Sequence, residues 1–190
     1  MTQLVLFLEE PSAREMLNGL LPRVLPDDLA FRCVVFEGKQ DLEKRLPGKL
    51  LGWRASDTLF VVLRDKDNGD CFRIKDKLVG ICRDAGREGT LIRIACHELE
   101  SWYLGDLSAV EVGLGVGGLS RHQGRVKYRN PDRLANPVQE LQRLTGNRYQ
   151  KVAGSRNIGP HLSLASNASH SFSVFISGIR KIIVGFAGDD

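Results

Sequence analysis

Hydrophobic residues in the first half of the chain gather into four short runs, separated by more polar segments. Each run is five or six residues long, which is too short for a helix, and valine, isoleucine or phenylalanine recurs in all of them. Such runs are typical of strands that are buried on both faces of a sheet. The predicted strands are residues 4–8, 31–36, 59–63 and 91–95.

Apolar residues at helical spacing lie between these runs. Ser12 and Glu15 form the sequence pattern of a capping box, which predicts a helix that begins there and continues to about residue 21. We expect Pro47 to end the second helix. Strands that alternate with helices across short links predict an α/β fold, with a mostly parallel sheet of about four strands flanked by helices. The other predicted helices are residues 39–46, 71–85 and 98–104.

The pattern changes after about residue 112. Glycines in residues 113–118 predict a flexible loop, and no strand-like run follows it. Asn136, placed before Pro137, marks the start of a helix. A last helix over residues 171–184 has one apolar face, which we expect to dock on the core. The two predicted parts are residues 1–112, a Rossmann-like α/β domain, and residues 113–190, a basic helical extension packed on the same core.

The charge distribution separates these parts more sharply than the net charge of +4 does. Residues 1–119 carry 16 basic and 19 acidic side chains, whereas residues 120–156 carry 9 basic and 2 acidic ones. A basic segment in the same chain as an acidic cluster is what a metal-dependent enzyme on a phosphate polymer needs. The alternative is a solvated basic face on ordinary helices.

The composition argues against membrane insertion and disulfide bonding. No apolar run approaches the roughly 20 residues that span a bilayer. The amino terminus lacks the positive segment of a signal peptide and is expected to form the first strand. The cysteines are scattered, with no Cys-x-x-Cys pair, which indicates reduced thiols in the cytoplasm, each a small buried hydrophobe. They are Cys33, Cys71, Cys82 and Cys96.

Acidic residues lie just beyond the ends of two of the predicted strands. Glu9 and Glu10 come after the first strand, and Asp65 and Asp67 come after the third. If these strands are neighbours, the acids meet beyond the carboxyl edge of the sheet, where ligand sites of open α/β folds gather. Side chains two residues apart in an extended segment point the same way, so Asp65 and Asp67 are expected to reach one metal ion. Clustered carboxylates repel one another unless a cation neutralises them, which predicts Mg²⁺ or Mn²⁺.

Other interpretations of these acids are open at this point. The DNGD segment at residues 67–70 also has the composition of a turn. A calcium-binding EF-hand loop requires glycine at its sixth position and glutamate at its twelfth, where this chain has Asp70 and Asp76. Phosphatases of the haloacid-dehalogenase type carry Asp-x-Asp after the first strand, and receiver domains lack the second acid.

The order of these motifs resembles the Toprim domain of topoisomerases, primases and OLD-type nucleases. That family has a glutamate just after its first strand, which Glu9 matches, and an Asp-x-Asp after its third, which Asp65 and Asp67 match. Glu10 stands where the broader family has glycine, so the two glutamates are both candidates for this role. The segments FLEEPSAREML, VLRDKDNGDC, ELESWYLGD and SFSVFISGIRKI resemble a small stand-alone branch of this fold, often encoded beside ABC-class ATPases and linked to phage defence.

The resemblance implies a Mg²⁺- or Mn²⁺-dependent nuclease or nicking subunit that cleaves phosphodiester bonds. It assigns acid–base catalysis or metal binding to Glu9, and metal binding to Asp65 and Asp67. Ala13 stands where many relatives have a further acid, for which other acids would compensate. The candidates for additional metal ligands are Asp70, Glu10, Glu98 and Glu100. The predicted nucleic-acid contacts are Arg121, Arg125, Lys127, Arg129, Arg133 and Lys151.

Two alternatives accompany this assignment. Acids such as Glu98 and Glu100 in the first turn of a helix also complement its dipole without any catalytic role. The chain as a whole is, in the alternative reading, a non-catalytic interaction or effector subunit of an ABC-class ATPase defence complex. Both functions imply a cytoplasmic protein with an ATPase partner, and the nuclease function adds nucleic acid as a partner.

Overall fold

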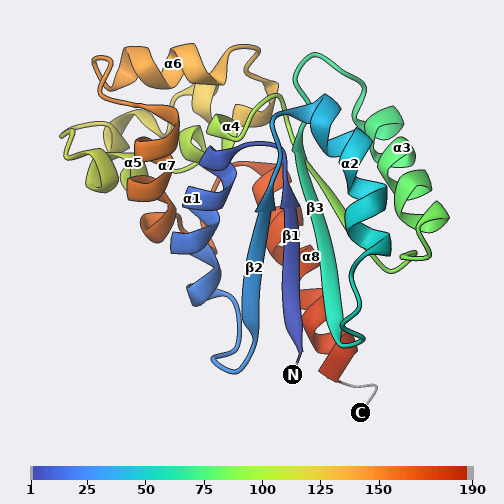
Figure 1. The fold of residues 1–190 in the computed structure, drawn as a ribbon. Coiled ribbons are helices and arrows are strands. Elements are labelled where there is room, and N and C mark those ends of the chain that lie inside the picture. Colours follow the sequence, from blue (N-terminus) through green and yellow to red (C-terminus); the bar gives the residue numbers. More distant parts are fainter. Residues whose placement is uncertain (1, 188–190) are drawn as a thin grey trace.

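The four predicted strands pair in parallel and form one sheet in the order β2-β1-β3-β4 (Figure 1). The computed structural model describes residues 2–187 of the chain. Helices cover both faces of the sheet, so the α/β class expected from the alternating pattern is confirmed. The strands are β1 (Gln3–Leu8), β2 (Ala30–Val35), β3 (Thr58–Asp65) and β4 (Leu91–Ala95).

Helices occupy the links between the strands and most of the second half of the chain. The α-helices are α1 (Pro11–Leu20), α2 (Lys39–Leu51), α3 (Cys71–Asp84), α4 (Glu100–Leu104), α5 (Leu107–Leu114), α6 (Pro137–Leu144), α7 (Lys151–Ile158) and α8 (His170–Ala187). Short 3-10 helices are η1 (Leu21–Arg23), η2 (Ser120–His122), η3 (Val126–Tyr128), η4 (Pro131–Arg133) and η5 (Gly159–His161).

Strand β1 is buried on both faces of the sheet, which explains its unbroken apolar sequence. Leu4, Leu6 and Leu8 have no exposed surface and belong to a core that includes side chains of α1 and α8. Val5 and Phe7 are also fully buried, and they belong to a second core formed with α2 and α3. The sheet therefore lies between two helical layers, and β1 supplies side chains to both.

Helix α2 continues through Pro47, whereas the sequence predicted a break there. Leu42, Leu46 and Leu50 recur every four residues along α2, and none of them has exposed surface. Full burial stabilises by about 1.5–3 kcal/mol per leucine, which over three residues exceeds the ~3 kcal/mol cost of an interior proline. Tertiary packing thus outweighs the local preference of proline.

The predicted capping box at the start of helix α1 is wrong. Pro11 is the first helical residue and Glu10 is the N-cap, and no side chain caps the helix. The Ser12 hydroxyl donates to Glu10 Oε1 over 2.6 Å, and Glu15 accepts from the Arg156 guanidinium over 2.7 Å. A proline at the first position leaves one fewer N–H group without a partner, so this helix needs less capping.

The second half of the chain packs directly on the first half and shares its core. Helix α7 lies against α1 and α5, and α8 lies against β4. Gly113, predicted to lie in a flexible loop, is part of α5 instead. A Cβ atom at this position would lie 2.7 Å from the carbonyl oxygen of Asn157 in α7, so the close contact of the two helices requires glycine.

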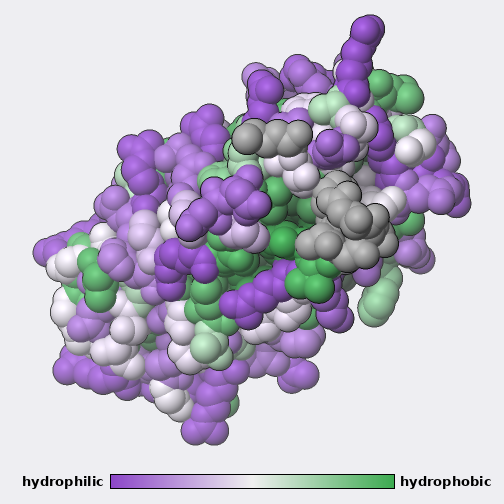
Figure 2. All heavy atoms as spheres, turned by 90° about the horizontal axis from the view of Figure 1, so that it is seen from below, coloured by the Kyte–Doolittle hydropathy of each residue, from purple (hydrophilic) through white to green (hydrophobic). Residues whose placement is uncertain are grey.

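The two ends of the sheet differ in character. Figure 2 views the molecule from below, from the side where the strands begin, and shows apolar side chains in the middle of this face with polar ones around them. The strands finish at the opposite end, where Glu9 and Glu10 follow β1 and Asp65 ends β3. Within residues 2–187, no helix combines the length and the apolar character needed to cross a membrane.

The four cysteines are free thiols, and only one of them is buried. Cys82 lies in the core between α3 and the sheet. Cys33, Cys71 and Cys96 are partly exposed, so the expectation of four buried cysteines is wrong for these three.

Candidate functional site

The pairing of β1 with β3 places Glu9 beside Asp65. Leu8 lies opposite Leu63 in this register, so Glu9, which follows β1, and Asp65, the last residue of β3, lie close together at the carboxyl edge of the sheet. The backbone N–H of Asp65 donates to Glu9 Oε2 over 3.3 Å. The two strands that carry the acids are therefore neighbours, as a shared site requires.

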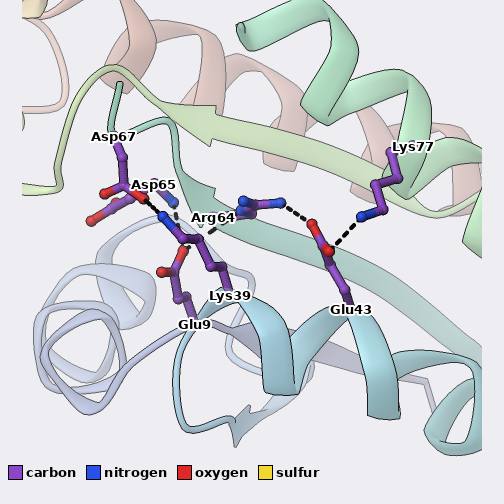
Figure 3. A network of polar contacts seen from close by, with 7 residues as sticks. All are labelled: Glu9, Lys39, Glu43, Arg64, Asp65, Asp67 and Lys77. Carbon is purple, nitrogen blue, oxygen red and sulfur yellow. Dashed lines mark hydrogen bonds and ion pairs between the residues drawn. The ribbon is translucent and has the colours of Figure 1, made fainter. Parts of the chain in front are cut away.

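Asp67 reaches this edge by a different route from the one predicted. Strand β3 ends at Asp65, and Asp67 adopts a left-handed conformation with a φ of 51° in the following turn. Its N–H donates to the His97 carbonyl over 2.6 Å, and its carboxylate forms a 2.7 Å ion pair with Lys39. The predicted extended segment from Asp65 to Asp67 is wrong. Figure 3 shows the turn bringing Asp67 to the Lys39 ammonium, close to Glu9.

Helices α4 and α7 add a second group of charges to the same edge. Glu100, the first residue of α4, has no exposed surface and accepts from the Tyr149 hydroxyl over 2.7 Å. Its other oxygen, Oε2, is buried and has no hydrogen-bond partner within residues 2–187. The ammonium of Lys151, the first residue of α7, lies 3.4 and 3.5 Å from the two carboxylate oxygens of Glu10.

Burial and mutual repulsion raise the pKa values of the acids in this cluster. Burial raises the pKa of Asp65 well above its usual range, and the carboxylates of Glu100, Glu10 and Glu9 add to the rise. Burial likewise raises the pKa of Glu9 and of Glu100. The pKa of Lys151 is raised as well, because the attraction of these acids outweighs the effect of its burial. In the absence of a bound cation, burial and like charge therefore favour the protonated forms of these acids.

Arg64 lies beside Glu9, and the sequence analysis overlooked it. The Arg64 side chain is only 8% exposed and forms an ion pair with Glu43 of α2. Its Nε atom lies 3.9 Å from Glu9 Oε2 (Figure 3). Lys77 of α3 binds the other Glu43 oxygen over 2.6 Å. A single arginine inside an apolar strand was the available signal, because an arginine buried there needs acidic partners.

Lys39 was also missed by the sequence analysis. It is the first residue of α2, the helix that follows β2. Helices that follow parallel strands begin at the carboxyl edge of the sheet, so the first residue of such a helix lies near the strand-end acids. That placement was the signal in the sequence, and it required knowing that β1, β2 and β3 are adjacent.

The donor set suits a hard divalent cation. Within residues 2–187 the buried Glu100 Oε2 has no hydrogen-bond partner, and burial together with nearby carboxylates raises the pKa of Asp65, so a bound cation would stabilise both groups. Residues 2–187 hold no ready-made group of three or more histidine, cysteine, aspartate or glutamate side chains that could bind one. Carboxylate oxygens are nevertheless the ligands that Mg²⁺ and Mn²⁺ prefer. The residues that would hold such an ion are Glu9, Asp65, Asp67 and Glu100.

Two other predicted ligands lie differently. Asp70 caps α3, since its Oδ1 accepts from the Arg73 N–H over 2.9 Å. Glu98 lies close enough to Glu100 and Lys151 for its charge to raise both pKa values. A metal contact by Asp70 or Glu98 stays a prediction.

Of the six predicted nucleic-acid contacts, Lys151 alone joins the acidic cluster in the described part of the chain. Lys127 forms a 2.6 Å ion pair with Glu140 of α6. The four arginines are exposed and form no ion pair with any residue in 2–187; they are Arg121, Arg125, Arg129 and Arg133.

Comparison with known proteins identifies a family and a fold. A family model described as "Domain of unknown function (DUF4276)" matches residues 8–180. No curated protein matches the chain. The C-terminal region of the Burkholderia pseudomallei OLD protein is similar in structure, with a TM-score of 0.56 and 17% identity, over 95% of this chain and 98% of that one. The C-terminal region of the Xanthomonas campestris pv. campestris OLD protein is similar too, with a TM-score of 0.52 and 14% identity over 97% of each chain.

These likenesses concern the fold. They confirm an OLD-like Toprim fold for the α/β sheet and its flanking helices. Because they cover nearly the whole chain, they include the helical second half that supplies Lys151.

We expect Asp65→Asn to raise the free energy of unfolding in chelator at about pH 8. The folded-state pKa of Asp65 is raised, so stability falls as the pH rises above the ordinary value of 3.8, and the neutral variant removes that loss. Urea unfolding at about pH 4 and about pH 8 measures the change.

Asp76→Asn, which removes an exposed acid on α3, is the matched control and should leave stability nearly unchanged. A variant Asp65→Asn that is less stable than the wild type at the higher pH would contradict the repulsion that we infer.

Proposed function

Because the chain belongs to the family described as a domain of unknown function, DUF4276, and folds like the C-terminal region of OLD proteins, we propose its function from the site. The proposed function is divalent-metal-dependent cleavage or nicking of phosphodiester bonds in nucleic acid. One observation carries the proposal: Glu9, Asp65 and Glu100 gather with Lys151 at one edge of the sheet, where the buried Glu100 Oε2 has no hydrogen-bond partner within residues 2–187.

Each charged group has a role that this reaction needs. Asp65, Asp67 and Glu100 would hold Mg²⁺ or Mn²⁺, which when bound activates water and stabilises the leaving oxygen. Glu9 would take up or release a proton, since its raised pKa brings it closer to neutral pH. Lys151 would turn from Glu10 to a phosphate oxygen of the substrate, to which an ammonium group donates a strong hydrogen bond.

The alternative function, a non-catalytic subunit of an ABC-class ATPase complex, draws on a different observation. Lys39 pairs with Asp67 and Lys151 pairs with Glu10, so the protein itself neutralises part of the cluster. Such ion pairs would stabilise this edge of the sheet without any catalytic role. For both functions we propose an ABC-class ATPase partner and a role in phage defence, on the strength of the motif resemblance.

We expect the purified chain, alone or with its ATPase partner, to cleave nucleic acid in Mg²⁺ or Mn²⁺, and Glu9→Gln to slow cleavage by roughly 10²- to 10⁴-fold. The substitution keeps the size of the side chain but removes its charge and its ability to transfer a proton. Single-turnover cleavage of a labelled oligonucleotide, followed on a gel, measures the rate.

Glu10→Gln is the control, because Glu10 is bound by Lys151 and Ser12 rather than by the backbone of Asp65. A strong loss in Glu10→Gln with a mild one in Glu9→Gln would assign the family glutamate to Glu10. Absence of cleavage by the wild type under all these conditions would reject the nuclease and leave the interaction subunit.

Binding of duplex DNA should weaken steeply with salt, because exposed arginines displace counterions from phosphates. Replacing Arg121, Arg125 and Arg133 together by glutamine should flatten the slope of log K against log salt by about 2 to 3, at ~0.9 per phosphate contact. Lys127→Gln is the control: its ion pair with Glu140 competes with a phosphate contact, so the slope should change by less than ~1. A wild-type slope near zero would indicate that residues 121–133 form an ordinary solvated surface without phosphate contacts.

A further inference from the structure

A small polar cleft lies beside the acidic cluster and shares Asp67 with it. The cleft has a volume of about 140 Å³ and lies where the turns after β3 and β4 meet the start of α6. We name it the amide cleft. Its polar lining residues are Asp67, Asn68, His97, Glu98, Asn136 and Gln139.

The amides of this cleft are free to bind a ligand. The side chains of Asn68, Asn136 and Gln139 are exposed and form no hydrogen bond with another residue in 2–187. Asn136 even occupies the N-cap position of α6 without capping it. Each amide offers both donors and an acceptor, which is the pattern that reads the edge of a nucleobase.

The two acids in the lining select against an anion. Asp67 and Glu98 would repel a phosphate group, so the backbone of a nucleic acid is directed to the lysines at the neighbouring cluster. Carboxylate and amide oxygens accept hydrogen bonds from an exocyclic amine. The lining therefore favours an uncharged ring that carries such an amine.

The size of the cleft fits one base. Its 140 Å³ has room for roughly four or five water molecules at ~30 Å³ each. Sites for complete drug-sized ligands are larger, at roughly 300–1,000 Å³. No phenylalanine, tyrosine or tryptophan lines the cleft, and His97 supplies its one aromatic ring. Recognition therefore rests mainly on hydrogen bonds to the base edge.

The walls are held in place by an unusual backbone arrangement. Asp67 and His97 have positive φ angles of 51° and 59°. Within residues 2–187, Asn147 is the one further non-glycine residue with a positive φ. The Asp67 N–H donates to the His97 carbonyl over 2.6 Å and ties the two turns together. Backbone strain of this kind clusters where a protein preorganises a binding site.

We propose that the amide cleft binds an unpaired adenine or cytosine of the nucleotide next to the bond that is cleaved. The inference rests on the proposed function and adds to it a single-stranded substrate with a preferred base. The amides would read the Watson–Crick edge, where adenine and cytosine each present an amine beside a ring-nitrogen acceptor, whereas guanine presents its amine beside an N–H donor. This edge is occupied in a duplex, so an unpaired base is required.

The test compares wild type with the double variant Asn136→Ala/Gln139→Ala in two assays. In the first, the ends produced from a randomised single-stranded oligonucleotide pool are sequenced. The wild type should enrich adenine or cytosine roughly tenfold over thymine at one position beside the cut, as expected for a base read by amide side chains. The double variant should lose this enrichment. Gln142→Ala, on α6 but outside the cleft, should retain it.

The second assay needs no cleavage: fluorescence anisotropy of labelled oligo-dA, oligo-dC and oligo-dT in chelator. The wild type should bind oligo-dA or oligo-dC more tightly than oligo-dT, and the double variant should bind all three alike. Equal binding and equal ends in wild type and variant would overturn the inference. A base preference in binding without any cleavage would support the cleft while rejecting the nuclease.

Discussion

The parallel pairing of β1 with β3 is the constraint on which the rest of the site depends. It fixes Leu8 opposite Leu63, so Glu9 and Asp65 must emerge together at the carboxyl edge. Burial raises the pKa of Asp65, and repulsion from Glu100, Glu10 and Glu9 adds to the rise. The buried apolar side chains of β1 hold this arrangement against that repulsion, because shifting the register by one residue would turn every side chain to the other face.

The second half of the chain supplies side chains that complete the site. The packing of α7 on α1 brings Lys151 to Glu10, and the Tyr149 hydroxyl fixes Glu100. The opposite charges of the Lys151–Glu10 contact thus come from residues that lie 141 positions apart in the sequence. The loss of α7 would leave the acids of β1 and β3 with less neutralising charge, which links the stability of this edge to the helical half.

The sequence predicts well both the strands and the acids at their ends, because both depend on local pattern. Short apolar runs located all four strands, and acids directly after them located Glu9 and Asp65. Errors arose where tertiary contacts decide. Pro47 stays inside α2 because three leucines are buried, and Asp67 turns because its backbone binds the β4–α4 turn.

The residues that were missed share one property: their partners lie on other elements. Lys39 binds Asp67 from α2, and Arg64 reaches Glu43 of α2 through the core. No local pattern carries such pairings, since they follow from the order of the strands. Only the parallel arrangement β2-β1-β3-β4 shows that these helices and turns begin at one edge.

The central claim is that this edge binds a divalent cation through its clustered acids. The most direct test is the melting temperature in Mg²⁺ or Mn²⁺ against chelator, because an ion that binds only the folded state stabilises it. We expect the ion to raise the melting temperature of the wild type and of Asp76→Asn, and the rise to disappear in Asp65→Asn/Asp67→Asn. An equal rise in the double variant would place the ion elsewhere, and no rise in the wild type would contradict the claim.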